Sequence, residues 1–158
     1  MTARTVAGSF RIGGEGISSP RFTATGPDER VALIDHYLVE HPDGVIILEL
    51  KRDDRSWDAW KRDLDDIEFM RVGVRGAFAA AEYVRAGLRC AHPVVTATHN
   101  PAPAPDHPRV PYDSCVPLLF PPDAVLPLRQ VRQLMIDFAL HGEWSVDVSW
   151  RARDHMVA

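Results

Sequence analysis

Apolar residues spaced three and four positions apart mark the helical parts of the chain. After Thr25–Asp28, whose Gly and Pro are typical of a helix start, Val31, Ile34 and Leu38 fall on one helical face. The same spacing recurs later, so the pattern predicts helices over residues 28–40, about 56–67 and 127–140. Gly142 follows the last of them as a helix-ending glycine.

Alternating or short continuous apolar runs predict strands between these helices. Val45–Lys51 is a compact apolar run, and Met70–Val74 alternates apolar with polar residues. The alanines of Ala77–Arg85 suit a helix and its aromatic residues suit a strand. We favour the strand, paired as a hairpin with the preceding one. The remaining strands are expected at residues 94–98, 116–120 and 144–150.

The order of these elements predicts the fold class. Several strands follow one another in the middle of the chain, which favours an α+β fold: a mostly antiparallel sheet with about three helices packed on it. The length of 158 residues suits a single domain. We expect that domain to span residues 27–158. We expect residues 1–26 to form an N-terminal segment that is either an edge strand around Ser9–Ile12 or mobile.

Charge and composition exclude several classes of protein. The chain has 18 Lys and Arg against 22 Asp and Glu, a net charge of −4, which argues against direct nucleic-acid binding through phosphate neutralisation. We see no apolar stretch of signal-peptide or membrane-span length, so we expect a cytoplasmic protein without membrane contact. We expect the two cysteines, Cys90 and Cys115, to be reduced and mostly buried.

One group of residues suggests metal chemistry. Pro42-Asp43 followed by Glu49-Leu-Lys51 resembles the PD-(D/E)XK nuclease motif, in which two carboxylates hold Mg²⁺ and the lysine orients the attacking water. Asp43 stands in a turn only six residues before Glu49, and Asp35, which has a better spacing, belongs to the first predicted helix. We therefore favour the alternative that these are the charged residues of a solvated strand end.

The histidines give no metal site at usual spacing. His92, His99 and His107 are seven and eight residues apart, whereas zinc ligands come as tight pairs. We interpret them as surface loop residues, and we expect no cofactor, no metal and no catalytic residues.

Acidic residues gather in one segment. Residues 53–68 contain seven acids against three bases, a local charge of −4. Trp57 and Trp60 share the apolar stripe of the predicted helix and are expected in the core, although they could also anchor an interface. The acidic face is either ordinary solvated surface or a patch that meets a basic partner. Our candidates for such contacts are Asp54, Asp58, Asp65 and Asp66.

The C-terminal third shows a family resemblance. Phe120–Leu128, rich in proline, leads into a helix that ends near Phe138 and Gly142, and Val146–Trp150 follows. Together with the segment Glu68–Val74, these residues resemble bacterial polymorphic-toxin immunity proteins of family 1. The resemblance covers about residues 28–152, and its last thirty residues carry the specific motifs.

The resemblance implies a role rather than a set of contact residues. Members of that family are small cytoplasmic antidotes that bind the toxin domain made by a neighbouring gene, commonly a nucleic-acid deaminase or nuclease, and block its active site. The resemblance therefore implies a non-enzymatic protein whose partner is a cognate toxin domain, as a monomer or a 1:1 heterodimer with it.

The antidote and nuclease hypotheses predict different results for the purified protein. If Glu49 and Lys51 belong to a nuclease site, the protein cleaves DNA in the presence of Mg²⁺ and Lys51→Ala abolishes the cleavage. If the protein is an antidote, we expect no cleavage above a buffer control with or without Lys51. Gel analysis of a linear DNA substrate checks this.

Overall fold

The computed structural model describes residues 8–15, 19–51, 67–87, 93–142 and 145–153. Within these residues the strands are β1 (Ser9–Gly14), β2 (Arg21–Ala24), β3 (Asp43–Lys51), β4 (Ile67–Arg75), β5 (Phe78–Ala86), β6 (Val94–His99), β7 (Pro111–Asp113), β8 (Leu118–Leu119), β9 (Leu126–Pro127) and β10 (Ser149–Ala152). The helices are α1 (Pro27–Glu40), α3 (Leu128–His141) and the 3-10 turn η1 (Pro122–Ala124).

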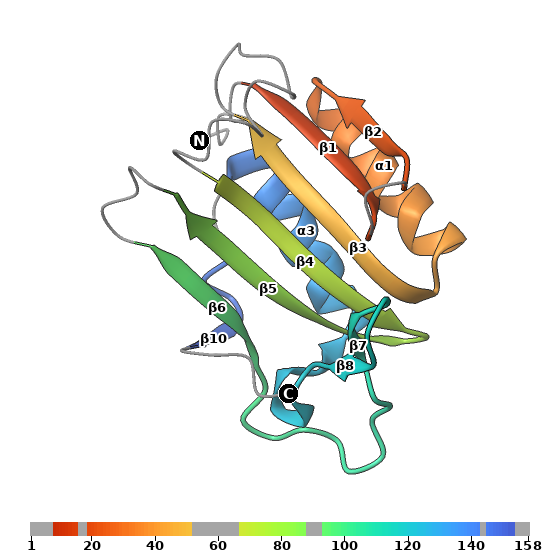
Figure 1. The fold of residues 1–158 in the computed structure, drawn as a ribbon, viewed down its shortest axis with the longest axis vertical. Helices are drawn as coiled ribbons and strands as arrows, with labels where there is room; N and C mark the ends of the chain where they lie inside the picture. The colour runs from red at the N-terminus through yellow and green to blue at the C-terminus, as the bar shows by residue number, and fades with distance from the viewer. Residues whose placement is uncertain (1–7, 16–18, 52–66, 88–92, 143–144, 154–158) are drawn as a thin grey trace.

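The main sheet is antiparallel throughout and has the two α-helices behind it (Figure 1). Its strands follow the order β10-β6-β5-β4-β3-β1-β2, and the short β9 pairs with β5. The long β3-β4-β5 meander forms its centre, with Leu48 opposite Met70 and Val72 opposite Ala81. The predicted α+β class with a mostly antiparallel sheet is confirmed.

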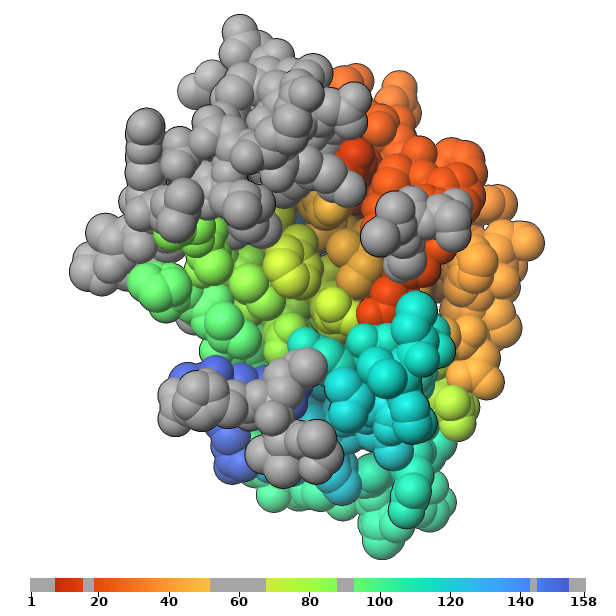
Figure 2. Space-filling view, viewed as in Figure 1, coloured from red at the N-terminus to blue at the C-terminus, as the bar shows by residue number. Residues whose placement is uncertain are grey.

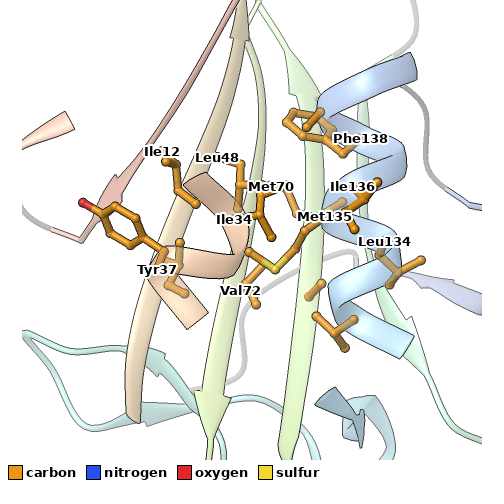
Figure 3. Packing of buried hydrophobic residues seen from close by; sticks show 14 of the residues in the cluster. Ile12, Ile34, Tyr37, Leu48, Met70, Val72, Leu134, Met135, Ile136 and Phe138 are labelled. Carbon is orange, nitrogen blue, oxygen red and sulfur yellow. The ribbon is translucent and has the colours of Figure 1, made fainter. Parts of the chain in front are cut away.

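The core lies between the sheet and the helices, because alternate residues of each strand point to the same face. Ile46, Leu48, Met70 and Val72 have no exposed surface and belong to one cluster with the apolar stripes of α1 and α3. Figure 3 shows side chains from both helices gathered on this face of the strands. Burial of a large apolar side chain contributes about 1.5–3 kcal/mol, so this layer is the main source of stability.

A buried arginine joins three elements at the edge of this core. Arg30 of α1 is 1% exposed; it donates from Nη1 to the carbonyl of Ala139 at 2.7 Å and from Nη2 to that of Gly8 at 2.9 Å. Burial lowers the pKa of Arg30, but a guanidinium remains charged at any physiological pH. Its hydrogen bonds therefore fix α1 against α3 and against the residue before β1.

Both described α-helices were predicted, and the third lies outside the described residues. The expected helices 28–40 and 127–140 correspond to α1 and α3, and Gly142 ends α3 with a left-handed φ of 66°. Of the expected helix at about 56–67, only Ile67 is described, and there the prediction is wrong because Ile67 begins β4.

The expected strand over residues 144–150 is wrong in its position. Residues 146–148 form a turn, in which the Asp147 N–H donates to Ser145 Oγ at 3.2 Å and Val146 is 92% exposed. The Trp150 indole N–H donates back to the Ser145 carbonyl at 2.9 Å, and strand pairing starts only at Ser149. The local serine hydrogen bond prevails over the alternating pattern.

Two further differences concern strand ends. The segment Ser9–Ile12, expected at an edge, lies one strand inside the sheet because β2 pairs beyond β1. The expected strand over residues 116–120 is reduced to Leu118–Leu119, since a turn occupies residues 114–117. No helix in the described part of the chain is long and apolar enough to cross a membrane.

A close backbone contact at Gly73 lets the small β7–β8 hairpin pack on the sheet face opposite α1 and α3. A Cβ atom at Gly73 would lie 1.9 Å from the Pro111 carbonyl oxygen and 2.9 Å from Val110. At Gly14, also in a strand, the nearest atom would be an ordinary 3.4 Å away. Only the absence of a side chain at Gly73 allows the hairpin to approach β4 this closely.

Gly73→Ala is therefore expected to lower the free energy of unfolding by about 1–3 kcal/mol, because the hairpin backbone must shift. Gly14→Ala is the matched control and should change it by less than about 0.5 kcal/mol. Urea unfolding followed by circular dichroism measures both. Equal effects of the two substitutions would contradict the proposed close packing.

Candidate interaction surface

The face of the sheet opposite the helices is the candidate interaction surface. Figure 2 views this face: the hairpin and the chain around it stand over its lower part, and atoms of the central strands are visible above. Strand residues that point here are partly charged, as Arg11, Glu49, Arg71 and Glu82 are, and partly apolar, as Ile47 is. Their charged groups form ion pairs, Arg11 with Glu49, Arg71 with Glu15 and Glu82 with Arg153.

Glu49, a candidate metal ligand, is bound by arginines. Its carboxylate forms an ion pair with Arg11 of β1, and Arg21 Nε lies 3.9 Å from Glu49 Oε2. The Glu49 side chain is 12% exposed. Two arginines compensate the negative charge of this mostly buried carboxylate. Glu49 therefore has a structural role, because it binds side chains of β1 and β2.

The other residues of the nuclease-like motif do not join Glu49. Asp43 lies on the same strand six residues earlier, about 20 Å away at the usual rise of a strand, and binds Arg75 at 2.6 Å. Asp35 lies in α1 and holds Arg132 of α3 through two hydrogen bonds of 2.6 and 2.9 Å. Lys51 is only 5% exposed and Glu49 only 12%, so the favoured interpretation of a solvated strand end is wrong as well. No group of three possible metal ligands occurs among the described residues.

A tyrosine connects the hairpin to the sheet. Tyr112 of β7 is 7% exposed, and its hydroxyl donates to Glu82 of β5 at 2.9 Å. The guanidinium carbons of Arg71 and Arg153 lie 4.8 and 5.3 Å from the centre of its ring. Burial, followed by the charge of Glu82, raises the pKa of Tyr112 to about 12. The base of the hairpin is thus held by a neutral phenol among charged groups.

The tip of the hairpin, Asp113–Leu119, is exposed yet ordered by hydrogen bonds. Asp113 Oδ1 accepts the N–H groups of Cys115 at 2.7 Å and Val116 at 3.2 Å. Glu15, from the end of β1, accepts both the N–H and the hydroxyl of Ser114, at 2.6 and 2.7 Å. Glu15 itself is paired with Arg71. Two carboxylates from different parts of the chain therefore fix this turn.

A pocket of about 740 Å³ lies beside the hairpin, between β6, β10 and the proline-rich loop. At its rim Arg151 donates to Asp123 at 2.6 Å, and His99 Nδ1 lies 3.5 Å from the same carboxylate. Arg109 and Arg153 also line it, so its charged residues are mainly basic. His99 belongs to this group and is the last residue of β6, whereas the sequence predicted a surface loop residue.

The predicted contact residues Asp54, Asp58, Asp65 and Asp66 lie outside the described residues. Glu68, the one described acid of that segment, does not fit a solvated helix face. It is 4% exposed in β4 and accepts the hydroxyl of Tyr83 at 2.8 Å. The prediction that Glu68 belongs to a solvated acidic face is therefore wrong. Its partner, Tyr83, lies on the next strand and is uncharged, so a count of charges along the chain does not reveal it.

Sequence reasoning also missed the hairpin tip. Cys115, expected to be mostly buried, is exposed, and Cys90 lies outside the described residues. The available signal was Asp113, since an aspartate two and three residues before unpaired N–H groups is typical of a turn. Nothing local pointed to Glu15, which is 99 residues from Ser114.

Comparison with known families identifies the chain. The model of the family described as Immunity protein Imm1 matches residues 20–152. The chain belongs to the Imm1 immunity protein family. Searches of curated proteins and of solved structures found no match. Membership implies that this Imm1 protein binds a cognate toxin protein, and the matched range includes both helices, the central strands and the hairpin.

Tyr112→Phe should destabilise the protein by about 1–2 kcal/mol, because the buried carboxylate of Glu82 loses a donor. The stabilisation that accompanies the raised pKa of Tyr112 is fully present below pH 10, the usual pKa of a tyrosine. It is lost as the pH rises toward 12. The difference in phenolate absorbance between the parent and Tyr112→Phe should therefore show one ionisation near pH 12 when folded and near pH 10 in urea. A folded-state ionisation near pH 10 would contradict the buried network.

Proposed function

We propose that this Imm1 protein neutralises a toxin domain that acts on nucleic acid, a deaminase or nuclease, by covering its active site. The observation that carries the proposal is the family match over residues 20–152. We further propose a 1:1 complex in the cytoplasm, where the neighbouring gene's toxin would otherwise reach nucleic acid.

The acidic segment supplies the physical reason for choosing this toxin class. An enzyme that binds nucleic acid presents basic side chains to the phosphates. Between residues 53 and 66 the chain has six acids and three bases, so an acidic surface there can occupy the same basic cleft. The candidates remain Asp54, Asp58, Asp65 and Asp66.

Other parts of the described surface fit this role less well. The rim of the large pocket is mainly basic, and the acids Glu15, Glu49 and Glu82 are paired with arginines. These carboxylates are not available to a basic partner without breaking ion pairs. We therefore assign the long-range attraction of a basic toxin to the acidic segment rather than to these carboxylates.

The deciding experiment pairs the protein with the toxin domain encoded beside its gene. Co-expression should restore growth, and the two chains should co-purify at a 1:1 ratio. The purified complex should show no deaminase or nuclease activity on single- and double-stranded substrates, whereas the free toxin domain is active. A toxin domain that acts on a substrate other than nucleic acid would refute the proposed class but not the antidote role.

Charge reversal tests the acidic segment. Asp58→Lys with Asp65→Lys should slow association with the toxin domain about tenfold or more at low salt and change dissociation by less than about threefold. The difference should shrink at high salt, because salt screens exposed charges. Stopped-flow mixing or surface plasmon resonance measures both rates.

Glu29→Lys with Glu40→Lys is the matched control. Both residues are exposed on α1, on the opposite side of the sheet from the candidate surface, and the change in net charge is the same. This control should retain most of the parent's association rate. Equal slowing in both double variants would show that net charge alone matters, and no slowing in either would exclude electrostatic steering by this segment.

A further inference from the structure

We infer that the hairpin tip, Asp113–Leu119, is a preformed apolar anchor that inserts into an apolar cleft of the toxin domain. This inference rests on the proposed function and adds to it a described contact surface. It is independent of the acidic segment, because it concerns packing rather than charge.

The first argument is that the base of the hairpin is fixed to the sheet. Pro111 sits against the bare backbone of Gly73, and the Phe120 N–H donates to the Val110 carbonyl at 3.0 Å. Phe120 also packs edge-on against Tyr112, with ring centres 5.1 Å apart. Val110 and Phe120 are 0% and 3% exposed, so the base belongs to a second buried cluster. The tip therefore projects from a rigid platform.

The second argument is that the tip itself has a defined conformation. Asp113 and Glu15 together hold the backbone N–H groups of three successive residues, Ser114 to Val116. Glu15 has a 12% exposed side chain and comes from a distant part of the chain. An ordered loop loses little conformational entropy on binding, which is the advantage of a preorganised inhibitor loop.

The third argument is what the ordered tip presents to solvent. Val116 is 49% exposed and Leu119 is 41% exposed. Cys115, which precedes Val116 in the turn, is also exposed. The other large exposed apolar residues of the described chain, Phe22, Val39, Val95 and Val146, are separated along it. Val116 on the fixed turn and Leu119 on the adjoining strand β8 line the same hollow, and together they present aliphatic surface that a partner can bury.

The partner that we propose for the hairpin tip is the toxin domain. The family implies a protein partner, and burial of an aliphatic tip needs a concave site with apolar walls, which enzyme clefts commonly have beside their charged groups. The tip alone is smaller than the about 800 Å² that a stable interface buries on each partner, so further parts of the surface contribute to the complex. Self-association is an outcome of the test.

The test introduces charge at the tip without touching the core. Val116→Asp with Leu119→Asp should weaken binding of a catalytically inactive toxin domain at least 100-fold, mainly through faster dissociation. Val39→Asp with Val146→Asp is the matched control, because these residues are 74% and 92% exposed elsewhere. The control should bind within threefold of the parent. Circular dichroism and urea unfolding verify that both double variants fold.

A third variant separates the conformation of the tip from its contacts. Glu15→Ala removes the hydrogen bonds to Ser114 while leaving Val116 and Leu119 in place. We expect about tenfold weaker binding, with a smaller effect than the double tip variant. Binding of Glu15→Ala equal to that of the parent would show that preorganisation plays no part.

Alkylation of the unmutated protein gives a second measurement that does not depend on the variants folding. Iodoacetamide should modify Cys115 at least tenfold more slowly in the toxin complex than in the free protein, with peptide mass spectrometry separating Cys115 from Cys90. Unchanged modification of Cys115 in a saturated complex would overturn the anchor.

The outcomes distinguish the two proposals. If the parent binds the toxin domain and the tip variant binds equally well, the anchor is refuted and the antidote role stands. If the parent does not bind the toxin domain at all, the proposed function itself fails. If the parent forms a dimer that the tip substitutions dissociate, the occupant is a second copy and the toxin assignment is wrong.

Discussion

The alternation of side chains along the β3-β4-β5 meander is the constraint on which the rest of the structure depends. Each strand sends every second residue to the helices, and those positions, such as Ile46 and Met70, are apolar and fully buried. The intervening positions must face the other side, where no described helix covers them. They are therefore occupied by ion pairs such as Glu49 with Arg11, or by contacts with the hairpin.

This division explains why the hairpin is positioned so firmly. The hairpin attaches to this face through a buried apolar cluster that includes Ala80 of β5, and through specific features: the missing side chain of Gly73, the phenol of Tyr112 and the stacked guanidinium of Arg71. Each needs accurate placement, because a buried carboxylate such as Glu82 is costly without its donors. Specific attachment at the base makes an ordered, exposed tip possible.

The sequence predicted those parts of the fold that local periodicity controls. The helix from residue 28 to 40 shows a clear pattern because one of its faces is buried. The strand from Val45 to Lys51 shows an apolar run because it is buried on both faces. The strand near the C-terminus was misplaced, because the hydrogen bond from Asp147 to Ser145 decides a turn that hydrophobicity does not reveal. The Arg21–Ala24 strand was missed, because its four residues are mostly polar or exposed.

The candidate interaction surface was harder to predict from the sequence than the fold was. Counting charges along the chain assigned Glu68 to an acidic face, although Tyr83 on the neighbouring strand binds it in the interior. The tip could not be recognised either, since its conformation depends on Glu15 at the other end of the chain. Contacts between residues distant in sequence decide which polar side chains are available to a partner, and a linear pattern contains no record of them.

The two proposed contact features have complementary physical roles. Exposed acids act over about one Debye length and mainly raise the rate of encounter, whereas a buried aliphatic anchor mainly slows dissociation. Charge alone would attract any enzyme with a basic nucleic-acid cleft, because such clefts share the same chemistry. The shape of an ordered tip, set by Asp113 and Glu15, discriminates between clefts of different form. In our proposal, selectivity for one cognate toxin comes from the hairpin, and speed of capture comes from the acidic segment.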